Sequence, residues 1–161
     1  MNHFELYKIP LSFNPDRDLI LARHDALMKD SERASQAEKA YDILEDPDAT
    51  VQYILEIKGL WQPDEVFEPD PQFSLEVSDI NEELMQLELD EKQEQLMDVE
   101  QKTNRLLLKK IEDVAAVMDN YEEDTGTGEE LLQVKEFYHQ KKYLEGILDR
   151  IRGVRNIASP S

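Results

Sequence analysis

The stretch from Pro71 to Gln101 constrains the fold of this chain most strongly, because it favours one long α-helix. It contains no glycine and no proline after its first residue, and it is rich in leucine, glutamate, glutamine and methionine, which are strong helix formers. Its apolar residues recur at alternating spacings of four and three, which places them on one face of a helix. We expect this face to hold a helical bundle together. Its residues are Phe73, Val77, Ile80, Leu84 and Leu87.

A second, smaller set of residues in the same stretch lies off that apolar face. Leu75, Asp79 and Glu82 are spaced by four and three, so they share a side of the helix. We expect this set to be presented to a partner protein. Its members are Ser74, Leu75, Ser78, Asp79 and Glu82.

The charge of the chain limits the partners it can bind. Among its 161 residues, 37 are acidic and 18 are basic, which gives a formal charge of -19 at pH 7. Nucleic acids and anionic membrane surfaces are bound through clustered lysine and arginine, so this balance argues against both. It suits a partner that carries a basic patch. The hydrophobic fraction of 40% is sufficient for a packed core.

Residues with obvious chemical roles are scarce. The absence of cysteine removes disulfides, thiolate metal sites and cysteine nucleophiles, and is compatible with a reducing compartment. His3, His24 and His139 do not stand at metal-ligand spacings, and no glycine-rich phosphate loop is present. The acidic stretch 119–130 does not match the register of a calcium-binding loop. We therefore expect no metal, no cofactor and no enzymatic activity, and rank an enzyme that uses paired carboxylates well below a binding protein.

Segments that would direct the chain to a membrane are not recognisable. The opening residues MNHFELYKIPLSF lack a basic region followed by a long apolar run, so no signal peptide is expected. No apolar stretch approaches the roughly 18 residues that a membrane span requires. We expect a cytoplasmic protein.

The N-terminal part of the chain predicts a short segment followed by three helices. Residues 1–13 are too short for an independent helix and should dock on the helices that come after them. Asn14 is expected to cap the next helix, and Ser31 the one after it. The first of these three helices should turn Leu19, Ala22, and Ala26 or Leu27 inward. The expected helices cover residues 15–30, 31–44 and 48–59.

The C-terminal part predicts a linker followed by long helices. Three prolines among acidic residues in 59–72 mark an extended linker. Beyond it, helix is expected over 71–101 and on to Asn120, and again over 129–152 after a glycine-containing turn. The inward residues of these later helices should include Leu107, Ile111, Val114, Met118, Tyr121, Phe137, Leu144, Leu148 and Ile151. No strand alternation competes, so the predicted fold is all-α.

Four segments, in the same order along almost the whole chain, carry a resemblance to a known family. They are FELYKIP, AYDILEDPDATVQYILEIKGL, DPQFSLEVSDINEELMQLE and LLQVKEFYHQKKYLEGIL, and together they resemble the HscB-type J-domain co-chaperones of iron–sulfur cluster assembly. The resemblance implies a J-domain-like helical domain over 1–60, a linker over 61–71 and an antiparallel three-helix bundle over 72–161, arranged in an L shape. In this family the J-domain engages a DnaK-class ATPase chaperone, HscA in many bacteria, and the bundle binds the cluster scaffold IscU.

The resemblance also implies where the scaffold would bind. The family's patch of apolar and acidic residues on the first bundle helix falls on the second set named above, and its aromatic from the last helix falls on Tyr143. Leu75 and Tyr143 would form a hydrophobic anchor, while Asp79 and Glu82 would meet basic residues of the scaffold. Ser74 and Ser78 stand where relatives often carry apolar residues.

One departure from the family concerns the chaperone partner. A J-domain carries His-Pro-Asp in the loop between its second and third helices, where it is needed to stimulate the ATPase, and this tripeptide is absent. His24 and Asp25 do not replace it, since they align inside the second helix. Either a loop is left out of the sequence between Asp30 and Ser35, or the chain is a degenerate J-like form. We favour the omission, because half a helix removed would take away packing surface that a small domain cannot spare.

Two functions correspond to these alternatives. The first is a co-chaperone that delivers IscU to HscA and stimulates ATP hydrolysis and cluster transfer. The second is a J-like adaptor that has lost ATPase stimulation and only binds a partner protein.

Overall fold

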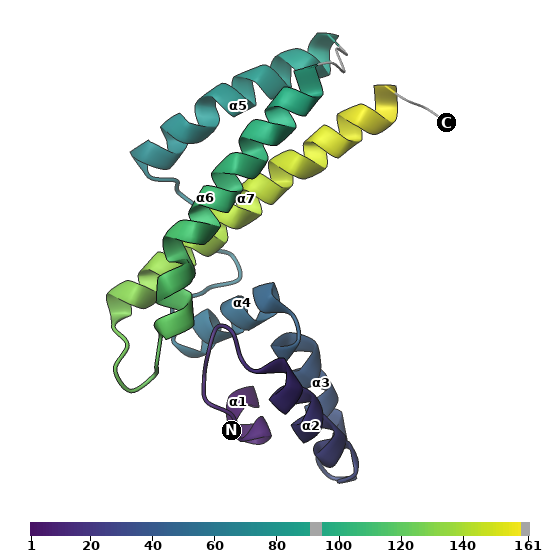
Figure 1. The fold of residues 1–161 in the computed structure, drawn as a ribbon, viewed down its shortest axis with the longest axis vertical. Coiled ribbons are helices and arrows are strands. Elements are labelled where there is room, and N and C mark those ends of the chain that lie inside the picture. The colour runs from purple at the N-terminus through teal and green to yellow at the C-terminus, as the bar shows by residue number, and fades with distance from the viewer. Residues whose placement is uncertain (91–94, 159–161) are drawn as a thin grey trace. The chain divides into compact units, whose positions relative to one another are not determined.

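The computed structural model of the protein describes residues 1–90 and 95–158 (Figure 1). Every regular element in these ranges is a helix, which confirms the all-α prediction. The expected continuation of helix across 91–94 lies outside the described residues. The helices are α1 (His3–Tyr7), α2 (Arg17–Met28), α3 (Ala34–Leu44), α4 (Pro47–Ile57), α5 (Pro71–Asp90), α6 (Leu96–Asn120) and α7 (Gly128–Ala158).

The chain forms two compact units, and the long helices α6 and α7 contribute residues to both. Unit 1 comprises Met1–Glu65 and Val114–Tyr138, and unit 2 comprises Val66–Asp113 and His139–Ser161. Residues 114–138, which the sequence places with the C-terminal bundle, group with the N-terminal helices because Val114, Tyr121 and Val134 are buried in the same core as α1–α4. The functional roles of the two parts stay a prediction.

The first 13 residues dock on the rest of unit 1, as expected. Phe4, Tyr7 and Phe13 are at most 2% exposed and lie in its core. Helix α1 is capped by Asn2, whose side chain accepts a hydrogen bond from the Glu5 amide at 2.8 Å. A segment too short to be stable alone is thus held by aromatic burial.

Helix α2 begins two residues later than the sequence indicates. Its cap is Asp16, whose carboxylate accepts the amides of Asp18 at 2.9 Å and Leu19 at 3.2 Å. The prediction of Asn14 as the cap is wrong, because that side chain instead donates to the Asp119 carboxylate at 2.6 Å. Both residue types can cap a helix, and a contact distant in sequence decides between them.

The inward face of α2 is also rotated from the prediction. Ile20 is buried and Leu19 and Leu27 are half-buried, whereas Ala22 and Ala26 are exposed. The two alanines carry too little apolar surface to orient the helix, so the larger side chains determine which face turns inward.

The junction between α2 and α3 is closed by a short turn. The sequence is continuous here, and the carbonyl oxygen of Asp30 accepts the amides of Arg33 at 3.1 Å and Ala34 at 2.9 Å. Ala37, Ala40 and Leu44 of α3 are buried at 3% exposure or less. The packing argument for an omitted loop therefore fails, since the short α3 still covers the core of unit 1.

The predicted Ser31 cap is wrong for the same reason. Helix α3 begins at Ala34, after an Arg33 whose side chain makes no capping hydrogen bond. The Asp30 carboxylate instead accepts the Glu32 amide at 3.0 Å inside the turn. Residues 31–33, which the prediction placed at the start of the helix, therefore belong to the tight turn before it.

Tyr7 connects α1 to both α2 and α3. Its hydroxyl donates to the carbonyl oxygen of Ala37 at 2.8 Å and lies 2.9 Å from Nδ1 of His24. A hydroxyl has a single proton, and a carbonyl has none, so the His24 ring must donate in the second bond. Burial, reinforced by Tyr41 and Asp42, raises the pKa of Tyr7 to about 12.

We predict that Tyr7→Phe changes the alkaline stability of the protein. In the folded state this phenol, with its pKa of about 12, keeps its proton to higher pH than in the unfolded chain, where its pKa has the ordinary value of 10.0. The wild type should therefore lose stability as the pH rises from 10 to 12, and the variant should lose less. At pH 7 the variant should be less stable by about 1–3 kcal/mol, because two hydrogen bonds are removed. Urea denaturation across this pH range measures both effects, and parallel pH profiles would contradict the assignment.

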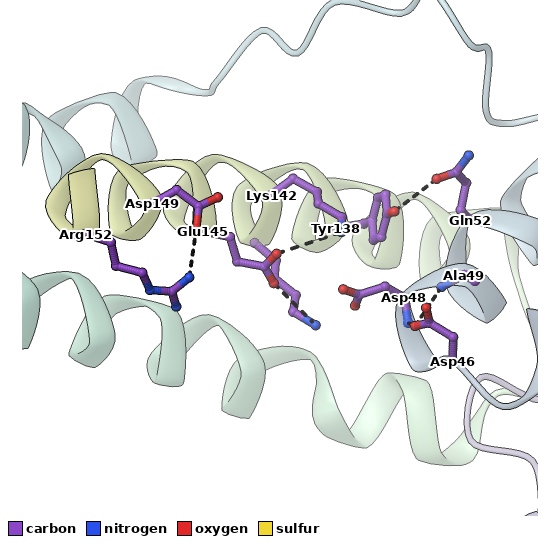
Figure 2. A network of polar contacts seen from close by, with 10 residues as sticks. Asp46, Asp48, Ala49, Gln52, Tyr138, Lys142, Glu145, Asp149 and Arg152 are labelled. Carbon is purple, nitrogen blue, oxygen red and sulfur yellow. Dashed lines mark hydrogen bonds and ion pairs between the residues drawn. The ribbon is translucent and has the colours of Figure 1, made fainter. Parts of the chain in front are cut away.

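Helix α4 begins at Pro47, one residue before the predicted start, and Asp46 caps it. The Asp46 carboxylate accepts the amides of Asp48 at 3.0 Å and Ala49 at 3.4 Å, with Pro47 in the first turn (Figure 2). Within unit 1, the Tyr138 hydroxyl of α7 donates to Oε1 of Gln52 at 3.0 Å (Figure 2). This bond fixes the first half of α7 against α4.

Unit 2 is built from α5 and the adjoining parts of α6 and α7. Lysine-to-glutamate bonds join Lys110 to Glu76 at 2.9 Å and Lys102 to Glu83, so α5 and α6 are antiparallel. Arg155 of α7 pairs with Glu100 of α6 at 3.2 Å. The predicted core residues of α5 are all buried, at 4% exposure or less. They are Phe73, Val77, Ile80, Leu84 and Leu87.

The predicted core face of α6 fails at one position. Ile111 is 39% exposed. Leu107, about one turn before it, is half-buried, and Val114, about one turn after it, is buried. Leu107 packs in the core of unit 2, and Val114 packs in the core of unit 1. One helix therefore serves two cores, and Ile111 falls between the two buried segments.

Candidate functional site

The predicted partner-binding residues of α5 lie on the side of the helix opposite its buried face. Ser74, Leu75, Ser78, Asp79 and Glu82 are all exposed, and Leu75 is exposed to 70%. A leucine this accessible contributes little to the core of unit 2. Its apolar surface is available to a partner.

The start of α5 sets the rotation of this face. The Asp70 carboxylate accepts the Phe73 amide at 2.7 Å, and its carbonyl oxygen accepts the Ser74 amide at 2.9 Å. The helix is capped here and Phe73 is fully buried. Leu75, two residues later, lies about 200° from Phe73 around the helix axis and therefore faces outward.

The acidic residues of α5 differ in their pairing. Glu76, Glu83 and Glu88 form ion pairs with Lys110, Lys102 and Arg150 of the neighbouring helices in unit 2. Asp79 and Glu82 form no ion pair within the part of the chain that the structure describes. The acids that remain uncompensated are thus those on the outer face.

The charge of Asp79 still reaches α6. A hydrogen bond from Lys102 to Glu83 raises the pKa of Lys102, and the charges of Asp79 and Asp98 add to this effect. Asp79 therefore lies at the border of the outer face that is nearer to α6.

Tyr143 of α7 lies at the opposite border. It is half-buried, and its hydroxyl accepts a hydrogen bond from Nδ2 of Asn81 at 2.8 Å. Its ring packs edge-on against Phe73, with centroids 5.6 Å apart, and against Phe67 at 6.4 Å. Phe67 in turn stacks on His139 at 5.1 Å. Tyr143 is consequently part of an aromatic cluster that closes the core of unit 2.

Tyr143 contacts a different side of α5 from the side that carries Leu75. Leu75 projects from α5 about 120° around the axis from Asn81, the residue that Tyr143 contacts. Ser74 and Ser78 occupy the angles between them. A surface formed by all six predicted residues would therefore have a polar centre, and its role in binding stays a prediction.

Three residues of this region were missed by sequence reasoning. Asn81 holds Tyr143, and Met85 and Leu89 extend the exposed face, at 55% and 78% exposure. A signal for the last two exists in the sequence, because residues 75, 78, 82, 85 and 89 repeat the alternating spacings of three and four.

We predict that Tyr143→Ala destabilises unit 2, whereas Leu75→Ala does not. Removing a half-buried ring from the aromatic cluster should lower the free energy of unfolding by roughly 2 kcal/mol. Removing the exposed leucine side chain should change it by less than about 0.5 kcal/mol. Tyr143→Phe, which removes only the Asn81 bond, should cost about 1 kcal/mol. Chemical denaturation measures all three, and an unchanged stability of Tyr143→Ala would contradict the cluster.

Groups of side chains suited to a metal ion were not found. Within residues 1–90 and 95–158, no cluster of three or more histidine, aspartate or glutamate side chains has a ligand arrangement. The described helices also include none that is long and apolar enough to cross a membrane.

Comparison with known proteins bears on the fold of the chain. No protein-family model and no curated protein sequence matches the chain. Among solved structures, the chaperone HscB from Vibrio cholerae matches it with a TM-score of 0.63. This chain has an HscB-type fold. The match covers 99% of this chain and 100% of HscB, at 20% sequence identity. A likeness at this identity concerns the fold, so function has to be argued from the surface.

Proposed function

We propose that this chain is an HscB-type co-chaperone that binds the iron–sulfur scaffold protein IscU through the outer face of α5 and brings it to the DnaK-class chaperone HscA. One observation carries the proposal. On an HscB-like fold, Leu75 is 70% exposed beside Asp79 and Glu82, two acids without an ion-pair partner in the described chain. An apolar side chain flanked by uncompensated charge is typical of a protein-binding surface.

The binding mechanism requires no covalent chemistry by this chain. Leu75 would insert into an apolar depression of the scaffold, and its desolvation would supply most of the affinity. Asp79 and Glu82 would meet basic residues and set the orientation of the partner. The exposed edge of Tyr143 would border the contact, while Ser74 and Ser78 would supply hydrogen bonds at its centre. The cluster itself is cargo of the scaffold.

We predict that Leu75→Ala weakens IscU binding by about 1–3 kcal/mol, because an interface anchor loses most of its buried area. Leu108→Ala should leave the affinity unchanged, since Leu108 is 55% exposed on α6, outside the proposed surface. Isothermal titration calorimetry measures both variants. The wild-type affinity should also fall with added salt, as the acids of α5 are screened. Equal affinity of the Leu75 variant and the wild type would remove this residue from the interface.

The second candidate function is an adaptor that binds its partners without stimulating ATP hydrolysis, and one feature of unit 1 favours it. The sequence has no His-Pro-Asp, and residues 29–33 close α2 onto α3 in a turn that leaves no loop for it. Helix α2 and its flanks also mix acidic with basic residues instead of presenting a basic surface. The mixed residues are Asp16, Arg17, Asp18, Arg23, Asp25, Lys29 and Asp30.

If the chain is the adaptor, we predict that it does not raise the ATPase rate of HscA, with or without IscU, whereas a co-chaperone that stimulates hydrolysis should raise it. The residues needed for stimulation are absent, while the surface proposed for IscU is intact. Steady-state ATP turnover by HscA is the measurement, with an HscB that carries His-Pro-Asp as the positive control. Stimulation comparable to that control would establish the first function and exclude the adaptor.

A further inference from the structure

Helix α5 carries a second stripe along its whole outer side. The buried residues of α5 follow spacings of four and three, and the outer residues Leu75, Ser78, Glu82, Met85 and Leu89 follow spacings of three and four. Three residues of this stripe are large, apolar and exposed. The exposed fraction is 70% for Leu75, 55% for Met85 and 78% for Leu89. Alternating spacings of three and four are those of a helix that packs lengthwise against another helix.

The stripe is longer than the proposed scaffold-binding patch. From residue 75 to residue 89 the helix rises about 21 Å, which corresponds to roughly four turns. A patch confined to Leu75, Asp79 and Glu82 leaves Met85 and Leu89 unexplained. Two large apolar side chains this exposed on one helix face mark an interaction surface.

The charges along α5 determine what fits this stripe. The helix contains no lysine and no arginine, and its acids are Glu76, Asp79, Glu82, Glu83, Glu88 and Asp90. Those adjoining the other helices of unit 2 are paired with cations, whereas Asp79 and Glu82 are not paired within the described residues. A partner that covers the stripe must therefore supply positive charge next to apolar side chains.

We propose that the outer face of α5 docks a basic amphipathic helix of the partner protein, laid along the stripe from Leu75 to Leu89. Apolar side chains of the partner pack on Leu75, Met85 and Leu89, and lysine or arginine side chains at its flanks approach Asp79 and Glu82. This rests on the proposed function, and it adds the secondary structure and charge of the bound segment and two contact residues, Met85 and Leu89.

A second copy of this chain does not suit the surface. It would place the acids of one α5 against those of another, and each chain carries a formal charge of -19. An anionic membrane is disfavoured for the same reason. A basic amphipathic helix instead supplies cations to Asp79 and Glu82, and its apolar face covers the exposed apolar side chains of the stripe.

The test combines a double variant, Met85→Ser with Leu89→Ser, and two probes. The probes are IscU and a synthetic helical peptide of about 18 residues with leucines at alternating spacings of three and four and lysines at the flanking positions. We expect the double variant to bind both probes at least about tenfold more weakly than the wild type. Leu108→Ser, at a position on α6 that is as exposed as Met85, should bind as the wild type does.

A second readout needs no variant. In methyl NMR spectra of the wild type, the peptide should shift the Met85 signal and leave the Met97 signal unchanged, since Met97 is 61% exposed on α6 outside the stripe. Circular dichroism of the double variant should match the wild type, because both replaced side chains are exposed.

The outcomes separate this inference from the proposed function. If the wild type fails to bind IscU, the proposed function falls, and the peptide alone decides whether α5 docks a basic helix. If the double variant binds the peptide and IscU as tightly as the wild type, attraction is electrostatic only and the inference is overturned. It is also overturned if sedimentation shows a wild-type dimer that the double variant abolishes, since the occupant is then a second copy.

Discussion

Burial of one face of α5 is the interaction on which the candidate site depends. Phe73 and Leu84 have no exposed surface, and each fully buried side chain of this kind stabilises the fold by about 1.5–3 kcal/mol. A helix that is fixed on one side by its core is fixed on the other as well, because about 3.6 residues per turn set the angle between them. The exposure of Leu75, Met85 and Leu89 is the direct consequence.

The distribution of charge in unit 2 results from the same packing. Acids at the edges of the buried face of α5 reach cations of α6 and α7, as Glu76 reaches Lys110 and Glu88 reaches Arg150. Asp79 and Glu82 on the outer face form no ion pair within the described residues, although the charge of Asp79 contributes to the raised pKa of Lys102. Three glutamates of α5 are therefore neutralised by cations of α6 and α7, and the acids of this helix left without an ion pair within the described residues, Asp79 and Glu82, lie on the same face as the exposed Leu75.

Unit 1 shows how a small helical unit can shorten a loop and keep its core. The small side chains of Ala37 and Ala40 leave room for the neighbouring helices to approach α3, and the Tyr7 hydroxyl bonds to its backbone. Unit 1 consequently keeps a packed core with only a short turn between α2 and α3.

The sequence by itself determined the all-α fold, the buried stripe of α5 and the start of α4 to within one residue, because each depends on residues within a few positions of one another. It did not determine the cap of α2, because the Asn14 side chain donates a hydrogen bond to Asp119, far along the chain. The sequence also did not determine the exposure of Ile111 between two cores or the closed turn at Asp30. The hydrogen bond from Asn81 to Tyr143 was likewise not predictable from it. Local spacing fixes which face of a helix is apolar, whereas the neighbour that covers that face is decided only when distant segments pack together.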